Sequence, residues 1–155
     1  MRSSLEIYDL ASGTARVVLQ SDRHIEAPNW DPSGTSLLVN AEGRLFRVPL
    51  DAPALLPVET GPATRCNNDH GISPDGTRLG YVRLEPQGDN WWASATIHTV
   101  GLDGRNDVAV TTHPGPADGC EWTPDGEWML LNTEQFSTAP PSAPGHAQLA
   151  RVRSD

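Results

Sequence analysis

Short apolar runs, each preceded by a tight turn, set the hydrophobic pattern of this chain. The turns read Asp-Pro-Ser-Gly, Ser-Pro-Asp-Gly and Thr-Pro-Asp-Gly, and the runs that follow them occupy residues 36–40, 78–82 and 128–132. Proline presets φ at the first turn position and glycine accepts a positive φ, so each motif predicts a hairpin. The runs are partly β-branched or aromatic, which predicts buried strands. The residue two places before each proline (Trp30, Ile72 or Trp122) is expected to pack inside the protein.

Further strand-like segments repeat in the same order after each turn. A third strand is predicted in the segments 44–50, 96–104 and 148–152, and a more polar fourth strand at 57–60 and 107–112. The three turn prolines are 42 and 50 residues apart. Four short strands at this period are typical of a β-propeller blade. The alternative is a β-sandwich whose strands resemble one another by accident.

The strand count predicts an all-β protein, a partial β-propeller of about three four-stranded antiparallel blades. The whole chain, 1–155, is interpreted as one propeller segment, with repeats at 25–60, 67–112 and 118–153 and an N-terminal strand pair at 5–20. A closed propeller typically has about four to eight blades. A ring that contains this chain therefore needs more strands than the sequence supplies.

Three stretches carry a family resemblance: 25–34, the run Cys-Asn-Asn-Asp-His-Gly-Ile-Ser-Pro-Asp-Gly at 66–76, and 122–126. With them the chain resembles the TolB-like β-propeller family and its WD-like Pro-Asp-Gly repeats over most of residues 4–135. The run at 66–76 looks like that of a cytoplasmic, TolB-related bacterial subgroup. The resemblance implies a propeller about twice this length, so the chain is expected to be a truncated or internally deleted relative, or one that dimerises into a ring.

Composition and charge narrow the function further. Acidic residues outnumber basic ones by 20 to 11, which gives a net charge of −9, and every basic residue is arginine. Without lysine, Schiff-base and P-loop lysine chemistry are excluded. The acidic balance argues against nucleic-acid binding. No apolar run is long enough for a membrane span or a secretory signal, so a cytoplasmic protein is expected. Cys66 and Cys120 are interpreted as free thiols.

Polar side chains near the start of the second repeat form the main candidate site. In a propeller the first strand of each blade lines the central channel, so Asn67, Asn68, Asp69 and His70 could hold a small polar ligand or a divalent metal. The alternative is that they make structural hydrogen bonds between blades. The nearby acids of the other repeats, Glu26 and Asp118, could surround the channel mouth with negative charge or be ordinary solvated acids.

A tryptophan pair forms the second candidate site. Trp91 and Trp92 follow a polar loop between the second and third strands of the middle repeat. They could stack on a sugar or anchor a peptide, since aromatic residues dominate recognition hot spots. Alternatively, one covers the blade edge while the other is exposed, or both are buried where two chains associate.

The sequence favours a noncatalytic module that binds a protein or a small polar ligand and acts as a scaffold. No Gly-x-Ser-x-Gly elbow occurs, and no catalytic residue, cofactor or metal is predicted. A homodimer is expected to complete the ring, because an open sheet edge invites pairing. Two alternatives remain: a metal-assisted lyase or hydrolase that acts on an oligosaccharide, and a degenerate half-propeller without independent function.

Overall fold

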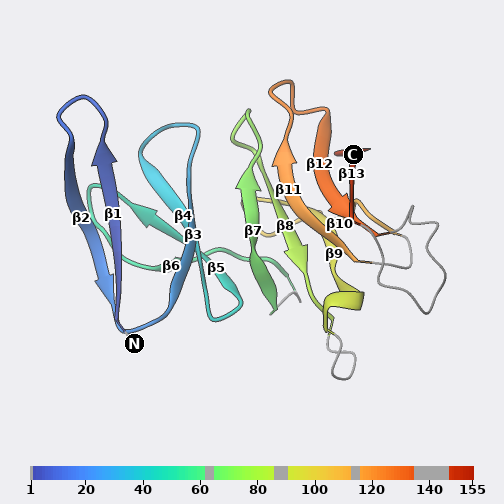
Figure 1. Cartoon of the computed structure of the whole chain (residues 1–155), viewed down its shortest axis with the longest axis horizontal. Coiled ribbons are helices and arrows are strands. Elements are labelled where there is room, and N and C mark those ends of the chain that lie inside the picture. Colours follow the sequence, from blue (N-terminus) through green and yellow to red (C-terminus); the bar gives the residue numbers. More distant parts are fainter. Residues whose placement is uncertain (1, 62–64, 86–90, 113–115, 135–146) are drawn as a thin grey trace.

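Four antiparallel sheets stand side by side in a row (Figure 1). The computed structural model describes residues 2–61, 65–85, 91–112, 116–134 and 147–155. The N-terminal hairpin lies at one end of the row and the sheet that contains the C-terminal strand lies at the other. Within the described residues, no helix has the length and apolar character needed to cross a membrane.

Each sheet is a meander in which strands pair in chain order. The hairpin consists of β1 (Ser3–Asp9) and β2 (Thr14–Ser21). The first four-stranded sheet contains β3 (Ile25–Trp30), β4 (Ser36–Ala41), β5 (Arg44–Pro49) and β6 (Leu56–Pro57). The second contains β7 (Cys66–Ile72), β8 (Arg78–Arg83), β9 (Thr96–Gly101) and β10 (Val108–Ala109). The last contains β11 (Ala117–Trp122), β12 (Trp128–Thr133) and β13 (Gln148–Arg153).

The predicted fold class, an all-β partial propeller, is confirmed. The fourth strands are shorter than expected, since β6 and β10 have two residues each. Beyond Pro57 one further bond to β5 follows, in which the Val58 N–H donates to the Leu45 carbonyl at 3.0 Å. Between β8 and β9 the chain forms a short 3-10 helix, η1 (Trp91–Ser94), which the sequence pattern did not predict.

The three turns share one hydrogen-bond pattern. In each, the glycine N–H donates to the carbonyl three residues earlier, at 2.8 Å, and the glycine has φ between 71° and 74°. The side chains differ in order. Ser73 and Thr123 donate to the aspartates two residues later, whereas the first turn has Asp31 first and Ser33 third. This exchange turns the Asp31 carboxylate inward, where it accepts hydrogen bonds from Ser36 and Arg47 at 3.0 Å.

An apolar layer fills each of the three spaces between neighbouring sheets. Leu5 of the hairpin packs with Val39 and Phe46 of the first sheet. Leu38, on the opposite face of β4, packs with Leu79 and Tyr81 of the second sheet. The last layer joins the second sheet to the third, and its members include Val82, Ile97 and Met129. Each fully buried side chain of this kind contributes about 1.5–3 kcal/mol, so the row is held by packing between sheets.

Trp30 does not pack as its position in the repeat predicted. Ile72 and Trp122 pack against the preceding sheet, and the Trp122 indole N–H donates to the carbonyl of Gly71 at 3.2 Å. Trp30 is 52 % exposed. Its preceding neighbour is the two-stranded hairpin, which has no inner strands to cover it. The prediction that Trp30 is packed was therefore wrong.

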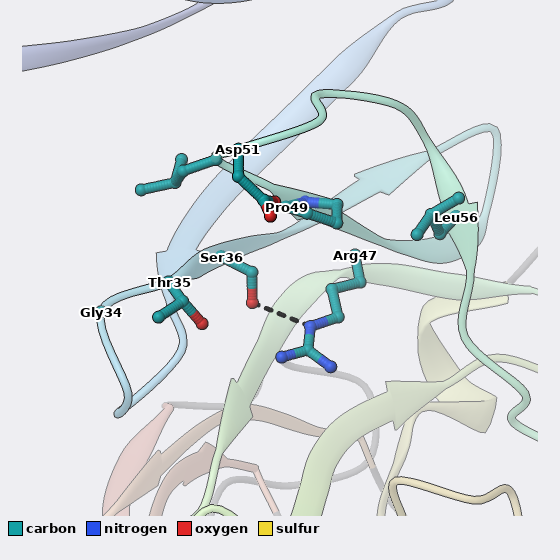
Figure 2. A pocket seen from close by; sticks show the side chains of 8 residues that line it. Gly34, Thr35, Ser36, Arg47, Pro49, Asp51 and Leu56 are labelled. Atoms are coloured by element: carbon teal, nitrogen blue, oxygen red, sulfur yellow. Dashed lines mark hydrogen bonds between the residues drawn. The ribbon is translucent and has the colours of Figure 1, made fainter.

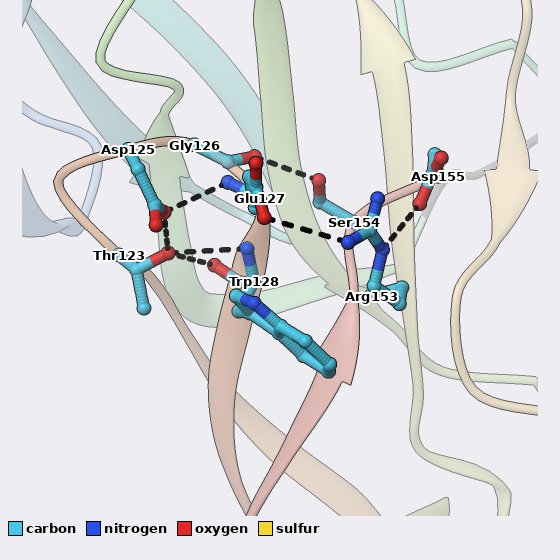
Figure 3. Close-up of polar contacts among 8 residues, drawn as sticks. All are labelled: Thr123, Asp125, Gly126, Glu127, Trp128, Arg153, Ser154 and Asp155. Carbon is cyan, nitrogen blue, oxygen red and sulfur yellow. Dashed lines mark hydrogen bonds and ion pairs between the residues drawn. The ribbon is translucent and has the colours of Figure 1, made fainter.

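Arg153, the last residue of β13, and Ser154, which follows it, form hydrogen bonds and an ion pair with the last turn (Figure 3). The Ser154 hydroxyl donates to the carbonyl of Gly126 at 2.8 Å, and its N–H donates to that of Glu127 at 3.1 Å. Arg153 forms ion pairs with Glu127 at 3.4 Å and Asp155 at 3.2 Å. These contacts fix β13 beside β12 from the turn side.

Candidate functional site

All three inner strands are interrupted by a β-bulge a few residues before the turn. The pairing register shifts between Glu26 and Asn29 in β3, between Cys66 and His70 in β7, and between Asp118 and Glu121 in β11. Two bulges contain a residue with positive φ, Ala27 at 48° and Gly119 at 73°. Bulges are common beside binding sites because they redirect side chains. The structure therefore has a repeated irregularity where the sequence had predicted plain strands.

The three bulges meet around a cavity of about 170 Å³, which we call the bulge pocket. Its lining residues come from three different sheets: Ala27, Pro28, Asn29, Asn68, Asp69, His70, Cys120 and Glu121. The candidate residues Asn68, Asp69 and His70 thus line one cavity. Asn67 and Asp118 lie immediately behind it and are connected to Asp69 by hydrogen bonds.

Hydrogen bonds tie β7 to β11 beside the bulge pocket. The Asn67 side-chain amide donates to the Asp118 carboxyl group at 2.6 Å, and the side-chain oxygen Oδ1 of Asn67 accepts from the N–H of Asp69 at 2.8 Å. The Gly119 N–H donates to the Asp69 carboxylate at 3.2 Å. Three polar residues and the N–H of Gly119 therefore form one network between neighbouring sheets, as the structural alternative had proposed.

The Asp118 carboxyl group has an unusual proton affinity. Burial raises its pKa to about 6, and a hydrogen bond with the neighbouring Asp69 carboxylate acts in the same direction. The amide of Asn67 opposes this shift by stabilising the ionised form. Asp118 is thus protonated below about pH 6, and its charge changes in a range where ordinary aspartates remain ionised.

Two asparagines that sequence reasoning missed tie the first sheet to β7. The Asn29 amide donates to the carbonyl of His70 at 2.8 Å. Asn40, which is 2 % exposed, donates to the carbonyls of Cys66 at 3.1 Å and Asn67 at 2.5 Å. These bonds satisfy backbone carbonyls that the bulge in β7 releases from the ladder. A signal was present in the sequence, because an asparagine interrupts the apolar second strand near its end in both the first and the last repeat, at Asn40 and Asn132.

His70 forms part of the wall of the bulge pocket and is 5 % exposed. Neither ring nitrogen has a hydrogen-bond partner among the described residues. Burial lowers its pKa, and nearby backbone groups of Leu38 and Asn68 oppose that shift only in part. The imidazole is therefore neutral at pH 7, with one nitrogen available as an acceptor.

The remaining candidates are not among the described residues that line the bulge pocket. The Glu26 side chain is 45 % exposed and lies 3.8 Å from His24. Trp91 and Trp92 begin η1, and their side chains lie outside the described part of the structure. Within the described part of the chain, no group of three or more His, Cys, Asp or Glu side chains is arranged to hold a metal ion. The metal-assisted alternative therefore has no support in these residues.

A larger cavity, of about 450 Å³, lies against the first sheet (Figure 2). Figure 2 shows Arg47 donating to the Ser36 hydroxyl, a bond of 2.8 Å. The same guanidinium pairs with Asp31 at 3.0 Å. Arg47 is the basic residue among the described lining residues of this cavity, and its charge is thus already neutralised within the fold. The cavity is therefore a weaker candidate for recognition of a charged ligand.

Comparisons with known proteins agree with this architecture. No family model matches the chain. It is 33 % identical to an uncharacterized protein of Agrobacterium fabrum over 194 residues, which cover all of this chain and 64 % of that protein. It is 30 % identical to a structure assigned as TolB from Agrobacterium tumefaciens, with a TM-score of 0.56, covering 99 % of this chain and 66 % of the other.

Two further solved structures share the fold at 18 % identity. The match to TolB from Acinetobacter baumannii has a TM-score of 0.73 and covers 97 % of this chain and 36 % of that TolB chain. The match to the tricorn protease has a TM-score of 0.66 and covers 96 % of this chain and 15 % of the protease chain. The resemblance to TolB-like β-propellers is thus confirmed, and the fold is that of a segment of such a propeller. The chain spans about two thirds of the Agrobacterium proteins it matches.

The alignment with the Agrobacterium fabrum protein also indicates residues missing inside the matched region. It spans 194 residues, whereas this chain has 155, so at least 39 positions (194 − 155) have no counterpart here. The turn prolines of this chain are 42 and 50 residues apart. The missing length is therefore close to that of one blade.

Proposed function

We propose that this chain is a noncatalytic binding scaffold that recognises a protein or a small polar ligand at the bulge pocket. The TolB-like propeller fold supports a protein-binding scaffold in general terms. The observation that carries the proposal is the convergence of three bulged inner strands on one polar cavity.

The nucleophiles near the bulge pocket support a noncatalytic role. Burial raises the pKa of the Cys120 thiol well above its usual range, and neighbouring acids act in the same direction. A thiol that remains protonated is a poor nucleophile. His70 lacks a carboxylate partner that would orient it as a base, since neither of its nitrogens is hydrogen-bonded among the described residues.

Selection from a random peptide library tests the scaffold proposal without assuming a ligand. The library is panned against the wild-type protein, and enriched peptides are then measured against Glu121→Ala and Asn68→Ala, both exposed positions whose truncation leaves the core intact. Asp22→Ala, an exposed acid outside the bulge pocket, is the control. The proposal predicts peptides whose binding is lost in the pocket variants and kept in the control. Selected peptides that bind the two pocket variants as tightly as the wild type would contradict the proposal.

We further propose that two copies associate through the two ends of the row of sheets. On the outer face of the hairpin, Val17 is 52 % exposed and lies opposite Glu6 in the pairing of β1 with β2. On the outer face of the last sheet, Leu130 and Leu149 are 47 % and 91 % exposed.

The two end faces are complementary in charge. The face of the last sheet carries Arg151, whose guanidinium carbon lies 4.4 Å from the Trp128 ring centre, while the neighbouring Arg153 is already paired with Glu127 and Asp155. The hairpin face carries Glu6 opposite Val17. Apolar area surrounded by opposite charges favours pairing of the two faces in a second copy of this chain.

Light scattering at micromolar concentration tests this association. A homodimer has twice the 16.7 kDa of one chain. Leu149→Glu is expected to give a folded monomer, because Leu149 makes little contact within the chain. Val108→Glu places the same charge on β10, away from both end faces, and should leave the dimer intact. A folded wild-type monomer would refute the association.

A further inference from the structure

The bulge pocket is lined by negative charge that nothing in the fold neutralises. Asp69 and Glu121 both line it, and Asp118 lies directly behind Asp69. Neither Asp69 nor Glu121 has an arginine or histidine within ion-pair distance among the described residues. By contrast, acids elsewhere in the chain do pair with arginines, as Asp31, Glu42 and Glu85 do. The described residues that line the cavity include no arginine. A ligand that enters is therefore favoured if it is cationic.

The neutral groups of the bulge pocket add acceptors to this charge. The Asn68 side chain is exposed and has no hydrogen-bond partner among the described residues, and the imidazole of His70 is buried with both nitrogens unpartnered. The exposed amide oxygen of Asn68 is thus available to accept a hydrogen bond from a ligand. The pocket thus combines two carboxylates and an amide oxygen with a wall that contains the neutral His70 imidazole, a set that suits a cation with several N–H donors.

The size of the bulge pocket limits the ligand to a single side chain or a small amine. Its volume is about 170 Å³, whereas pockets for drug-sized ligands or cofactors have roughly 300–1,000 Å³. An oligosaccharide or a nucleotide would not be enclosed by it. A guanidinium or ammonium group with its alkyl chain is of suitable size.

A second groove, of about 140 Å³, lies directly beside the bulge pocket and shares Pro28 with it. Tyr8 and Trp30 line this aromatic groove and are 60 % and 52 % exposed, and Ile7 and Leu37 complete its apolar wall. Exposed aromatic side chains next to a charged pocket are typical of sites that bind peptides. The pair of cavities thus suits a chain with a cationic residue next to an apolar one, more than a free amine.

From this combination we propose that the bulge pocket binds the arginine or lysine side chain of a protein partner, with the neighbouring apolar residue of that partner in the aromatic groove. This deepens the proposed scaffold function and rests on it. The cation forms charge-assisted hydrogen bonds with Asp69 and Glu121, which are roughly twice as strong as neutral ones. The chain itself contains no lysine, and a basic partner would complement its net charge of −9.

Calorimetric titration with small neutral-backbone probes tests the cation. N-acetyl-arginine amide is compared with N-acetyl-citrulline amide, which has the same shape without the charge. We expect the citrulline compound to bind about tenfold or more weakly. Glu121→Gln and Asp69→Asn should each weaken arginine binding, whereas Asp22→Asn should not change it. Raising the salt concentration should weaken it as well. Equal binding of arginine and citrulline probes would overturn the proposal.

Two further probes identify the source of the cation. N-acetyl-leucyl-arginine amide adds an apolar residue, and agmatine is a free guanidinium amine. A protein partner predicts that the leucyl compound binds more tightly than N-acetyl-arginine amide, and that Trp30→Ala removes this gain. Agmatine binding at least as tight as that of the leucyl compound would overturn the protein source.

The outcome of this titration is separate from that of the library selection. If selected peptides depend on the bulge pocket but contain no arginine or lysine, the cation proposal is wrong and the scaffold proposal stands. If no selected peptide depends on the pocket, the scaffold proposal itself fails. Folding of each variant is checked by its urea unfolding midpoint, so that a loss of binding is not confused with a loss of structure.

Discussion

The two ends of the inner strands are built on different principles. At the turn end, each Pro-Ser-Gly or Pro-Asp-Gly hairpin closes its own hydrogen bonds within about six residues. At the bulge end, the ladder is interrupted, and side chains from neighbouring sheets provide the bonds instead, as Asn40 does for Cys66 and Asn67. The turn end is thus a local device that repeats three times. The bulge end exists only where blades meet, which is where a binding surface can vary.

The two ends also differ in the proton affinity of their acids. Hydrogen bonds from Ser73 and Thr123 lower the pKa of Asp75 and Asp125. Burial raises that of Asp118 to about 6. Turn-end carboxylates are therefore satisfied in the ionised form, whereas the bulge end holds a carboxyl group that is not. The charge of the bulge end therefore changes at a higher pH than that of the turn end.

Asn40→Ala should have the largest effect, about 1–3 kcal/mol on the free energy of unfolding, because it leaves two carbonyls beside the bulge without a donor. Urea denaturation measures it. Asn132→Ala is the matched control, since Asn132 lies near the same end of β12 and its amide donates no hydrogen bond to the described residues. The control should change stability by less than about 0.5 kcal/mol. An equal loss in both variants would remove the distinction between the two ends.

Gly76→Ala should cost about 1–2 kcal/mol, because Gly76 has φ of 74° and a left-handed backbone is unfavourable for alanine. No atom lies within 4 Å of an added Cβ, so the cost is conformational and not steric. Gly76→Asn should cost less, since asparagine tolerates this region better. Binding of N-acetyl-arginine amide should stay unchanged in both. A change in binding would mean that the turn end contributes to recognition.

Asp118 predicts a pH dependence opposite to that of the turns. Its folded pKa, about 6, lies above the ordinary value of 3.8, so its contribution to stability is complete below about pH 4 and disappears as the pH rises through 6. The lowered pKa values of Asp75 and Asp125 stabilise the fold at neutral pH, and this stabilisation is lost only as the pH falls below the ordinary aspartate pKa of 3.8.

Urea midpoints at about pH 4.5 and 7.5 test the prediction in the wild type and in Asp118→Asn. The wild type should lose stability relative to the variant as the pH rises. Burial lowers the pKa of His70 and His98, which contribute stability that is lost as the pH falls through 6.5, but both remain in the variant and cancel in the difference. A difference that does not change with pH would argue against the raised pKa of Asp118.

Arg47→Ala should have the smallest effect, about 0.5 kcal/mol, because the Arg47 side chain is 49 % exposed and its ion pair with Asp31 is screened by water. Thermal unfolding of this variant, with Arg16→Ala on the exposed hairpin as control, measures it. A loss above about 2 kcal/mol would mean that the first turn depends on β5 far more than the other two turns do on their third strands.

The turn end could be predicted from sequence, and the bulge end could not. Proline and glycine determine the turns through their own backbone limits, so Pro74 and Gly76 indicated a hairpin without reference to the rest of the chain. The bulges depend on which carbonyls a neighbouring sheet can satisfy. Asn40 stood out only as a polar residue in an apolar strand, and Asn29 gave no local sign of its partner. Trp30 shows the same limit, since its exposure depends on a neighbour that lacks inner strands.

The candidate site was predicted in part for the same reason. Asn67, Asn68, Asp69 and His70 are adjacent in sequence, so any fold that uses β7 as an inner strand brings them together. Glu121 and Asn29 join them only because neighbouring sheets pack side by side. Glu121, which follows the register shift in β11, lines the cavity, whereas Asp118, which precedes the shift, is not among the lining residues.

Amide chemical-shift mapping in a titration with N-acetyl-leucyl-arginine amide tests the central claim most directly. The account predicts that the largest shifts occur at the amides of Asn68, Asp69, Gly119 and Glu121, while those of the turn glycines Gly34, Gly76 and Gly126 stay unchanged. Shifts concentrated at the turn glycines, or the absence of any shift at the bulges, would contradict the assignment of recognition to the bulge end.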